Sequence, residues 1–210
     1  MCTGQKKTHD FIINWLKEGL QTNHDRPFFT FGFSSEYTHN GNECFGLLED
    51  ASLDFLYTVT NMEHYNNTFV FLISDHGSRF GAIRHLEIGK LEERTPYFGI
   101  IVPPNFRHEF PGKYKHFLSN TNRLTTPLDI YNTLIDILGE YEDTDLKKRS
   151  YSLFENIPEE RTCADAGIEP HWCTCLTWNK VSHSDKNVTI VATAVVEYIN
   201  SLMTCPTPLS

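Results

Sequence analysis

The residues best suited to chemistry directly follow a short apolar run. Residues 69–73 read Phe-Val-Phe-Leu-Ile, and Ser74, Asp75, His76 and Gly77 come next. Such a run is short for a helix and rich in β-favouring residues, so it predicts a strand buried on both faces. A carboxylate and an imidazole side by side at the carboxyl end of a strand can hold a divalent metal ion. The alternative is a turn aspartate beside a surface histidine, because the motif is only three residues long.

A second candidate lies at the end of another predicted strand. Residues 28–33 read Phe-Phe-Thr-Phe-Gly-Phe, and Thr38, His39 and Asn40 follow a few residues later. His39 could ligate the same metal or contact a substrate oxyanion, whereas the alternative is a partly exposed loop histidine. Asn40 is the weaker candidate, because an amide brings no negative charge to a metal.

Hydrophobic spacing predicts the elements that would position these residues. We expect helices over 8–22, 47–63 and 128–138, a short helix within 105–122, a strand over 97–102, and a helix or strand over 187–203. Trp15 is expected in the core and Gly139 at a helix C-terminus. Because strands alternate with helical crossovers, the fold class predicted is α/β, with a mostly parallel sheet flanked by helices.

Composition narrows the function classes. The chain of 210 residues has a formal net charge of −9 and contains no block of lysine and arginine. These values argue against nucleic acid or an anionic membrane surface as a partner. No apolar run approaches the roughly 18 residues that a membrane-spanning helix needs.

Six cysteines are present, and four of them, Cys163, Cys173, Cys175 and Cys205, lie in the C-terminal quarter of the chain. This clustering favours disulfides and an extracellular or secretory-lumen location, although no signal peptide is visible in the first residues. A zinc site is the alternative, because Cys173 and Cys175 lie beside His171. Asn66 and Asn187 stand in glycosylation acceptor sequences, which agrees with secretion.

The composition changes after Pro158, where cysteine, proline and tryptophan become frequent. We therefore expect an α/β domain over residues 1–157 and a cysteine-containing C-terminal appendage over residues 158–210.

Three motifs together resemble the alkaline phosphatase-like superfamily, which includes the sulfatases. They are Asp75-His76-Gly77, then Gly89-Lys90, then Arg94-Thr95-Pro96 leading into the strand expected at 97–102. The residues between Arg79 and Arg94 more closely resemble an uncharacterised branch that is abundant in nematodes and other animals. The resemblance covers about residues 28–175.

The resemblance implies a site that binds a divalent metal, zinc, manganese or calcium, through Asp75, His76 and His39. It also implies that Lys90 contacts the oxyanion of a phosphate or sulfate ester, with His39 as a second candidate for that role. The nucleophile and a further acid of this superfamily come from earlier strands, which would lie before residue 1. We therefore expect a truncated hydrolase that retains part of its metal site and lacks its N-terminal strands.

Two alternatives remain open. The chain could be a secreted, non-catalytic binding protein on the same fold, or a purely structural α/β domain in which Asp75 and His76 form a turn. The expected ligand is a small anionic ester, a sulfated or phosphorylated glycan, or a lipid head group.

Overall fold

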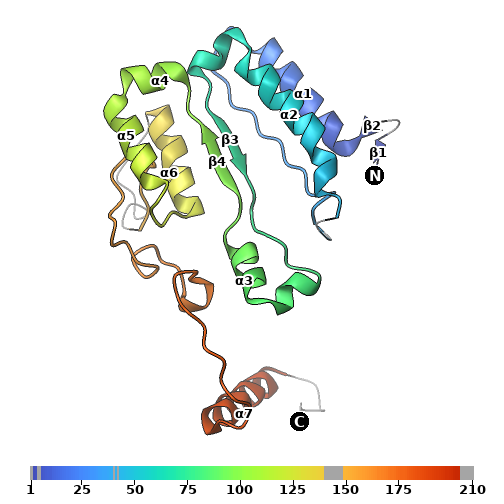
Figure 1. Ribbon diagram of the computed structural model, residues 1–210, viewed down its shortest axis with the longest axis vertical. Helices are drawn as coiled ribbons and strands as arrows, with labels where there is room; N and C mark the ends of the chain where they lie inside the picture. The colour runs from blue at the N-terminus through green and yellow to red at the C-terminus, as the bar shows by residue number, and fades with distance from the viewer. Residues whose placement is uncertain (1, 4–5, 40, 42, 140–148, 204–210) are drawn as a thin grey trace. The chain divides into compact units, whose positions relative to one another are not determined.

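The computed structural model describes residues 2–3, 6–39, 41, 43–139 and 149–203. Contacts divide the chain into two units, Met1–Thr174 and Cys175–Ser210. Figure 1 shows the helices and strands of each unit. The first unit carries the helices α1 to α6 and all described strands, and the second carries α7.

The first unit is mainly helical. Its α-helices are α1 (Thr8–Thr22), α2 (Glu49–Thr60), α3 (Glu87–Arg94), α4 (Pro104–Glu109), α5 (Pro111–Asn120) and α6 (Pro127–Leu138). Short 3₁₀ helices are η1 (Phe45–Leu48), η2 (Glu63–Asn67), η3 (Ala82–His85) and η5 (Pro170–Trp172). The strands are β1 (Cys2–Thr3), β2 (Lys6–Lys7), β3 (Val70–Ile73) and β4 (Phe98–Ile101). The helices predicted over 8–22 and 128–138 are confirmed, and the segment 105–122 contains two helices.

Helix α6 shows how local sequence sets helix ends. Pro127 occupies its first turn, and Thr126 and Asp129 form a capping box in which each satisfies the backbone N–H of the other. At the other end Gly139 adopts a left-handed conformation with φ of 72°. A residue with a Cβ atom adopts this conformation only with strain, so the predicted glycine C-cap is confirmed.

The predicted parallel sheet is wrong. Strands β3 and β4 pair antiparallel, with Val70 opposite Ile101 and Ile73 opposite Phe98. The connection between them leaves and returns at the same end, because the Gly77 N–H donates to the Glu93 carbonyl over 3.1 Å. A chain that returns to the end it left must run back antiparallel. Among the described residues this ribbon and the short β1–β2 pair are the only sheets.

The strand predicted over 28–33 is also wrong. This segment is extended, but residues 27–34 make no backbone hydrogen bond to any other described residue. It lies against α1, since a Cβ atom on Gly32 would contact the side chains of Ile12 and Leu16. Phe29 is 77% exposed, so the apolar pattern in this segment does not report a buried strand here.

One core lies between α1, α2 and the β3–β4 ribbon. Leu20 from α1, Val59 from α2 and Val70 from β3 are buried against one another. Burying apolar side chains stabilises this contact by roughly 25 cal/mol per Å² of area removed from water. Trp15 is 53% exposed, so its predicted place in the core is wrong.

A second core is aromatic. Phe69, which precedes β3, contacts Phe106 of α4 and Phe154, with ring centroids 5.1 Å and 5.7 Å apart. Phe117 of α5 adds a further contact to Phe154, which is itself 2% exposed. Offset and edge-to-face aromatic pairs contribute beyond their buried area. Phe154 therefore attaches the segment after α6 to α4 and α5.

An ion pair fixes the same segment from the other side. The guanidinium of Arg161 donates to both carboxylate oxygens of Asp129, over 2.9 Å and 3.2 Å. It also donates to the carbonyl oxygens of Leu124 and Arg149. The Asp129 carboxylate additionally accepts from the Tyr151 N–H over 2.8 Å. Asp129 is fully buried, so its charge depends on this network.

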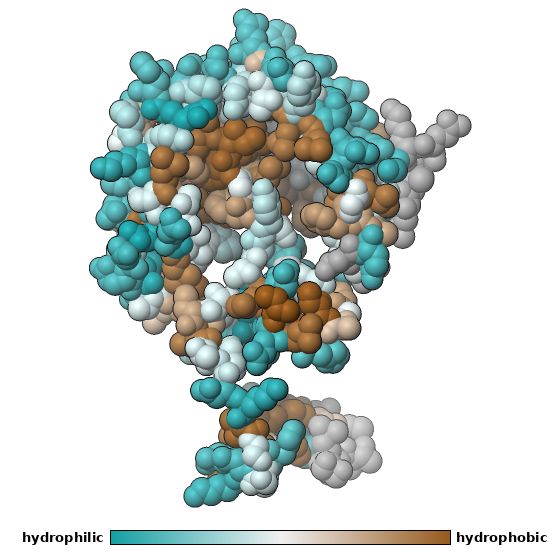
Figure 2. Space-filling view, viewed as in Figure 1, coloured by the Kyte–Doolittle hydropathy of each residue, from teal (hydrophilic) through white to brown (hydrophobic). Residues whose placement is uncertain are grey.

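Helix α7 (Lys186–Leu202) forms the second unit, which confirms the helical alternative for residues 187–203. None of its residues is buried, and apolar side chains lie open on its surface (Figure 2). They include Ile190, Val191, Val195, Tyr198 and Leu202. Among the described helices none is both long enough and apolar enough to cross a bilayer.

We expect Arg161→Met to lower the free energy of unfolding by about 3–5 kcal/mol, because it leaves the Asp129 carboxylate buried without its cation. Urea denaturation followed by circular dichroism measures this loss. Arg26→Met is the matched control, since Arg26 pairs with Asp25 and the two side chains are 65% and 64% exposed. The control should lose less than about 1 kcal/mol. Equal losses in the two variants would contradict the role assigned to Arg161.

His9 makes the stability pH-dependent. It is buried on α1, where its Nε2 lies 3.3 Å from the Ser52 hydroxyl of α2. Burial lowers the pKa of His9 below its usual 6.5, although the nearby Asp10 opposes this. Around pH 6.5 the imidazole therefore binds more protons in the unfolded chain than in the folded one. As a result, the free energy of unfolding has its full value above pH 6.5 and decreases as the pH falls through that value.

We expect His9→Gln to flatten the dependence of unfolding free energy on pH between 7.5 and 5.5. His108→Gln, which changes an exposed histidine on α4, should leave that dependence as it is. Denaturation curves at several pH values provide the measurement. A His9→Gln curve parallel to that of the unaltered chain would show that His9 does not carry the effect.

Candidate functional site

The loop after β3 holds Asp75 and His76 in a defined turn. The Ser74 N–H donates to the Tyr97 carbonyl over 2.9 Å, which continues the antiparallel ladder past β3. The Ser74 hydroxyl donates to the His76 carbonyl, and the His76 N–H donates to Asp75 Oδ1 over 3.0 Å. These contacts place the two side chains that the sequence singled out next to each other at the strand end.

The hydrogen bonds of His76 define its tautomer. Nδ1 lies 2.7 Å from the Gly77 carbonyl, which can only accept, so Nδ1 carries the proton. Nε2 therefore presents its lone pair, and the Arg79 guanidinium donates to it over 2.5 Å. Asp75 Oδ2 lies 3.5 Å from the same Nε2. A neutral imidazole with its other nitrogen held by a carbonyl is the usual arrangement of a metal-ligating histidine.

The geometry of this pair fits one divalent metal ion. Two ligand atoms about 2.1 Å from a tetrahedral zinc ion lie roughly 3.4 Å apart, close to the separation of Asp75 Oδ2 and His76 Nε2. The Asp75 side chain is 63% exposed, so an ion could reach it from solvent. The Arg79 guanidinium donates to His76 Nε2, so a metal ion bound to this nitrogen would displace it.

His39, the third predicted ligand, is placed by an aromatic contact. Its exposed ring lies 5.9 Å from the ring of Phe80, which follows Arg79. This contact brings His39 to the loop that carries Asp75 and His76. The contact does not bring the His39 imidazole to Asp75 Oδ2 and His76 Nε2. The role of His39 as a metal ligand or oxyanion contact therefore stays a prediction.

Gly77 allows this loop to pack against α3. A Cβ atom at position 77 would overlap the Glu92 carbonyl. The Gly77 N–H also donates to the Glu93 carbonyl, so the loop backbone lies directly on the last turn of α3. The glycine of the Asp-His-Gly motif is therefore required for close approach, whatever the motif binds.

Gly89 has the same function at the start of α3. It is buried, and a Cβ atom there would overlap the Ile83 carbonyl of η3. This contact brings Arg84 of η3 beside Glu93, with 3.7 Å between guanidinium and carboxylate. The Gly-Lys motif thus combines a packing glycine with an exposed lysine, Lys90, on the following residue.

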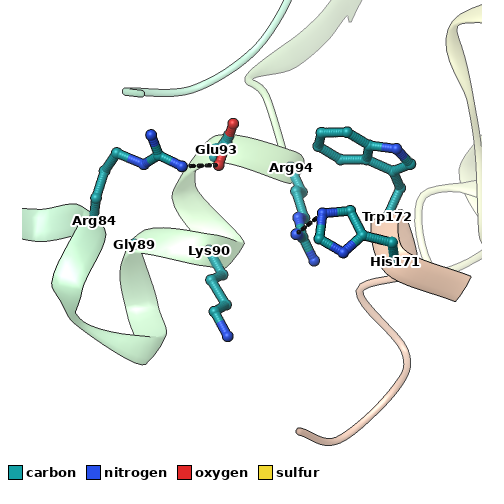
Figure 3. Close-up of a pocket in the computed structure, with 7 residues that line it drawn as sticks. All are labelled: Arg84, Gly89, Lys90, Glu93, Arg94, His171 and Trp172. Carbon is teal, nitrogen blue, oxygen red and sulfur yellow. Dashed lines mark hydrogen bonds and ion pairs between the residues drawn. The ribbon is translucent and has the colours of Figure 1, made fainter. Parts of the chain in front are cut away.

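Lys90 lines a pocket of about 200 Å³ that α3 forms with η3 and η5. Its lining residues are Arg84, Gly89, Lys90, Glu93, Arg94, His171 and Trp172 (Figure 3). Asp75 and His76 are not among them. Lys90 was predicted to contact the same ester as the metal ion. The structure places it in a pocket that the predicted metal ligands do not line.

Sequence reasoning did not predict the wall formed by His171 and Trp172. Arg94 donates to His171 Nε2 over 3.3 Å, and its guanidinium lies 5.1 Å from the centroid of the Trp172 ring. A disulfide between Cys163 and Cys173 closes the loop that carries these residues. The clustered cysteines indicated a constrained loop, but nothing in their spacing indicated that it would meet α3.

For Cys163 and Cys173, the structure decides between a disulfide and a zinc site. Cys173 is bonded to Cys163 and therefore has no thiolate to give to zinc. Cys44 and Cys175 are free and exposed, and Cys205 lies outside the described residues. The predicted disulfide is confirmed by this pair.

Comparison with known proteins gives one match. A family model described as a protein of unknown function, DUF229, matches residues 1–206. No curated protein and no solved structure matches the chain significantly.

We expect Gly77→Ala to destabilise the contact between the loop and α3, because the added methyl overlaps the Glu92 carbonyl. Hydrogen exchange of the amides of α3 should accelerate at least about tenfold, which corresponds to roughly 1.4 kcal/mol. Gly112→Ala on α5 is the control, since open space surrounds that position. Unchanged exchange in α3 would contradict the packing function of Gly77.

Proposed function

This chain belongs to the DUF229 family, which is related to sulfatase-like proteins, and we propose that it binds a divalent metal ion through Asp75 and His76 as part of a site for sulfate or phosphate esters. The residues between Arg79 and Arg94 support its assignment to the uncharacterised branch that is abundant in nematodes. The metal would be zinc, manganese or calcium.

One observation carries the proposal. His76 is held in the tautomer that leaves Nε2 as an acceptor, with Asp75 Oδ2 3.5 Å away. Nε2 accepts from Arg79 in this structure, and the same lone pair would bind the metal once Arg79 moved aside. Asp75 would supply the negative charge and His76 the neutral nitrogen.

The residues around the metal ligands favour binding over turnover. A bound divalent ion would polarise an ester oxygen and lower the pKa of an attacking hydroxyl. The neighbouring hydroxyls of Ser74 and Ser78 both donate to backbone carbonyl oxygens. Neither is therefore arranged as a nucleophile against a general base. This favours the non-catalytic binding protein over the hydrolase as the role of the described residues.

Secretion forms part of the same proposal. The Cys163–Cys173 disulfide needs an oxidising compartment to persist, and the glycosylation acceptors Asn66 and Asn187 are both exposed. Expression through a secretory pathway should give a product whose electrophoretic mobility shifts on glycosidase treatment. Asn66→Gln together with Asn187→Gln should abolish the shift, and a product without glycan at either site would contradict this assignment.

We expect the chain to bind one of the three metals with micromolar or tighter affinity in calorimetry. Asp75→Ala combined with His76→Ala should weaken binding at least about tenfold, because both ligands are lost. His24→Ala combined with Asp25→Ala is the matched control, since these residues form another adjacent and exposed histidine–aspartate pair. No binding by the folded chain, or equal weakening in both variants, would overturn the metal assignment.

Hydrolysis distinguishes the two functions. Aryl sulfates and aryl phosphates should remain uncleaved by the metal-loaded chain if its role is binding. Turnover that disappears in the Asp75→Ala and His76→Ala variant would instead establish the hydrolase.

A further inference from the structure

Residues 27–34, between α1 and η1, have the features of a strand without a neighbour. The segment is extended, and its backbone makes no hydrogen bond to any other described residue. One face of it is covered, because a Cβ atom on Gly32 would contact the side chains of Ile12 and Leu16 on α1. The unpaired N–H and carbonyl groups along its edges are a template for pairing with another strand.

The opposite face of this segment is apolar and open. Because side chains alternate along an extended chain, Phe29, Phe31 and Phe33 lie on the face away from Gly32. They are 77%, 69% and 58% exposed, and the ring centroids of Phe31 and Phe33 lie 6.5 Å apart. Three neighbouring aromatic rings in water are costly, so an interaction that covers them is favourable.

The order of the residues favours pairing with a second copy of the same segment. When two copies run antiparallel about a two-fold axis at Phe31, Phe31 lies opposite Phe31 and Phe29 lies opposite Phe33. Cross-strand aromatic pairs of this kind stabilise an antiparallel ladder. An axis at Thr30 or Gly32 would instead place a phenylalanine opposite Pro27 or Ser35. The hydrophobic pattern therefore specifies the register.

The charges at the ends of the segment fit the same register. No charged residue occurs between Arg26 and Glu36, and Phe31 lies midway between them. Arg26 of each copy therefore lies opposite Glu36 of the other. In the described part of the chain Glu36 makes no ion pair, and the Arg26 guanidinium pairs only with its neighbour Asp25. Opposite charges directly across a ladder favour pairing, and like charges oppose it.

The position of Pro27 agrees with this arrangement as well. Residues of an antiparallel pair alternate between hydrogen-bonded and non-hydrogen-bonded positions. When Phe31 occupies a non-hydrogen-bonded position, so do Phe29, Phe33 and Pro27, because they are an even number of residues away. Pro27 then needs no N–H, and the phenylalanines occupy the positions at which paired side chains lie closest.

We propose that residues 28–34 pair antiparallel with the same residues of a second copy, centred on Phe31, and that this segment is the interface of a homodimer. Each copy contributes the same surface, as a two-fold axis requires. The occupant is a second copy rather than a strand of another protein, because the aromatic register and the end charges are self-complementary. The dimer involves none of the proposed metal ligands.

Sedimentation equilibrium of the chain over a wide range of concentrations measures this association. We expect a monomer–dimer equilibrium. Phe31→Glu places two carboxylates opposite each other at the axis and should weaken the dimer at least about tenfold. Tyr57→Glu is the matched control, since this aromatic side chain of α2 is 72% exposed. The control should change the dissociation constant less than about twofold.

Exchanging the end charges tests the register. Arg26→Glu and Glu36→Arg each place like charges opposite each other, so each should weaken the dimer about three- to tenfold. The variant with both changes restores opposite charges and should dimerise within about twofold of the unaltered chain. Such a rescue requires that the two residues meet across the interface.

Three results would overturn the proposal. They are a chain that is monomeric at every concentration, equal weakening in Phe31→Glu and Tyr57→Glu, and no rescue when the two charge changes are combined. A monomeric chain would leave the open edge to a strand of another protein. Circular dichroism of each variant confirms that the fold is retained. Should Phe31→Glu fail to fold, the charge exchange decides the outcome.

Discussion

The buried pair of Asp129 and Arg161 is the constraint on which the first unit depends. One carboxylate caps α6, accepts from the backbone at Tyr151 and neutralises a guanidinium that also satisfies two carbonyl oxygens. A buried charge is costly when any of its partners is removed, so these contacts form together or not at all. The pair therefore joins α6 to residues 149–161 as a single unit. The aromatic packing of Phe154 then attaches that unit to α4 and α5.

Close backbone contacts play the corresponding role around α3. Gly77 and Gly89 lie at opposite ends of this short helix, and each meets a carbonyl oxygen that a side chain would displace. The loop that carries Asp75 and His76 and the pocket beside Lys90 are thus built on the same eight residues, although Asp75 and His76 do not line that pocket. The glycines of the Asp-His-Gly and Gly-Lys motifs are thus explained by packing, and they give no evidence about what Asp75, His76 and Lys90 bind.

The sequence predicted what is encoded locally. Helices α1 and α6 and the glycine cap at 139 follow from periodicity and end signals within a few residues of each element. Strand direction is different, because an apolar run such as residues 69–73 contains no information about which way its partner runs. The prediction of a parallel sheet requires residues 28–33 to form a strand and the intervening helix to cross over, whereas the backbone of that segment has no hydrogen-bonded neighbour among the described residues.

The same distinction applies to the sites. Asp75 and His76 are adjacent in the chain, so their juxtaposition could be predicted, but Trp172 reaches α3 only through tertiary structure.

Electrostatics bears on the small anionic ester that we propose as the ligand of this acidic chain. Charges farther away than the Debye length, about 8 Å at physiological ionic strength, are largely screened. A small anion in the pocket therefore responds mainly to Arg84, Lys90 and Arg94 and little to the excess acidic residues elsewhere. A long polyanion such as nucleic acid extends beyond that distance and meets the acidic surface as well. The net charge of −9 therefore disfavours an extended polyanion, whereas a small ester beside these cations would be little affected by it.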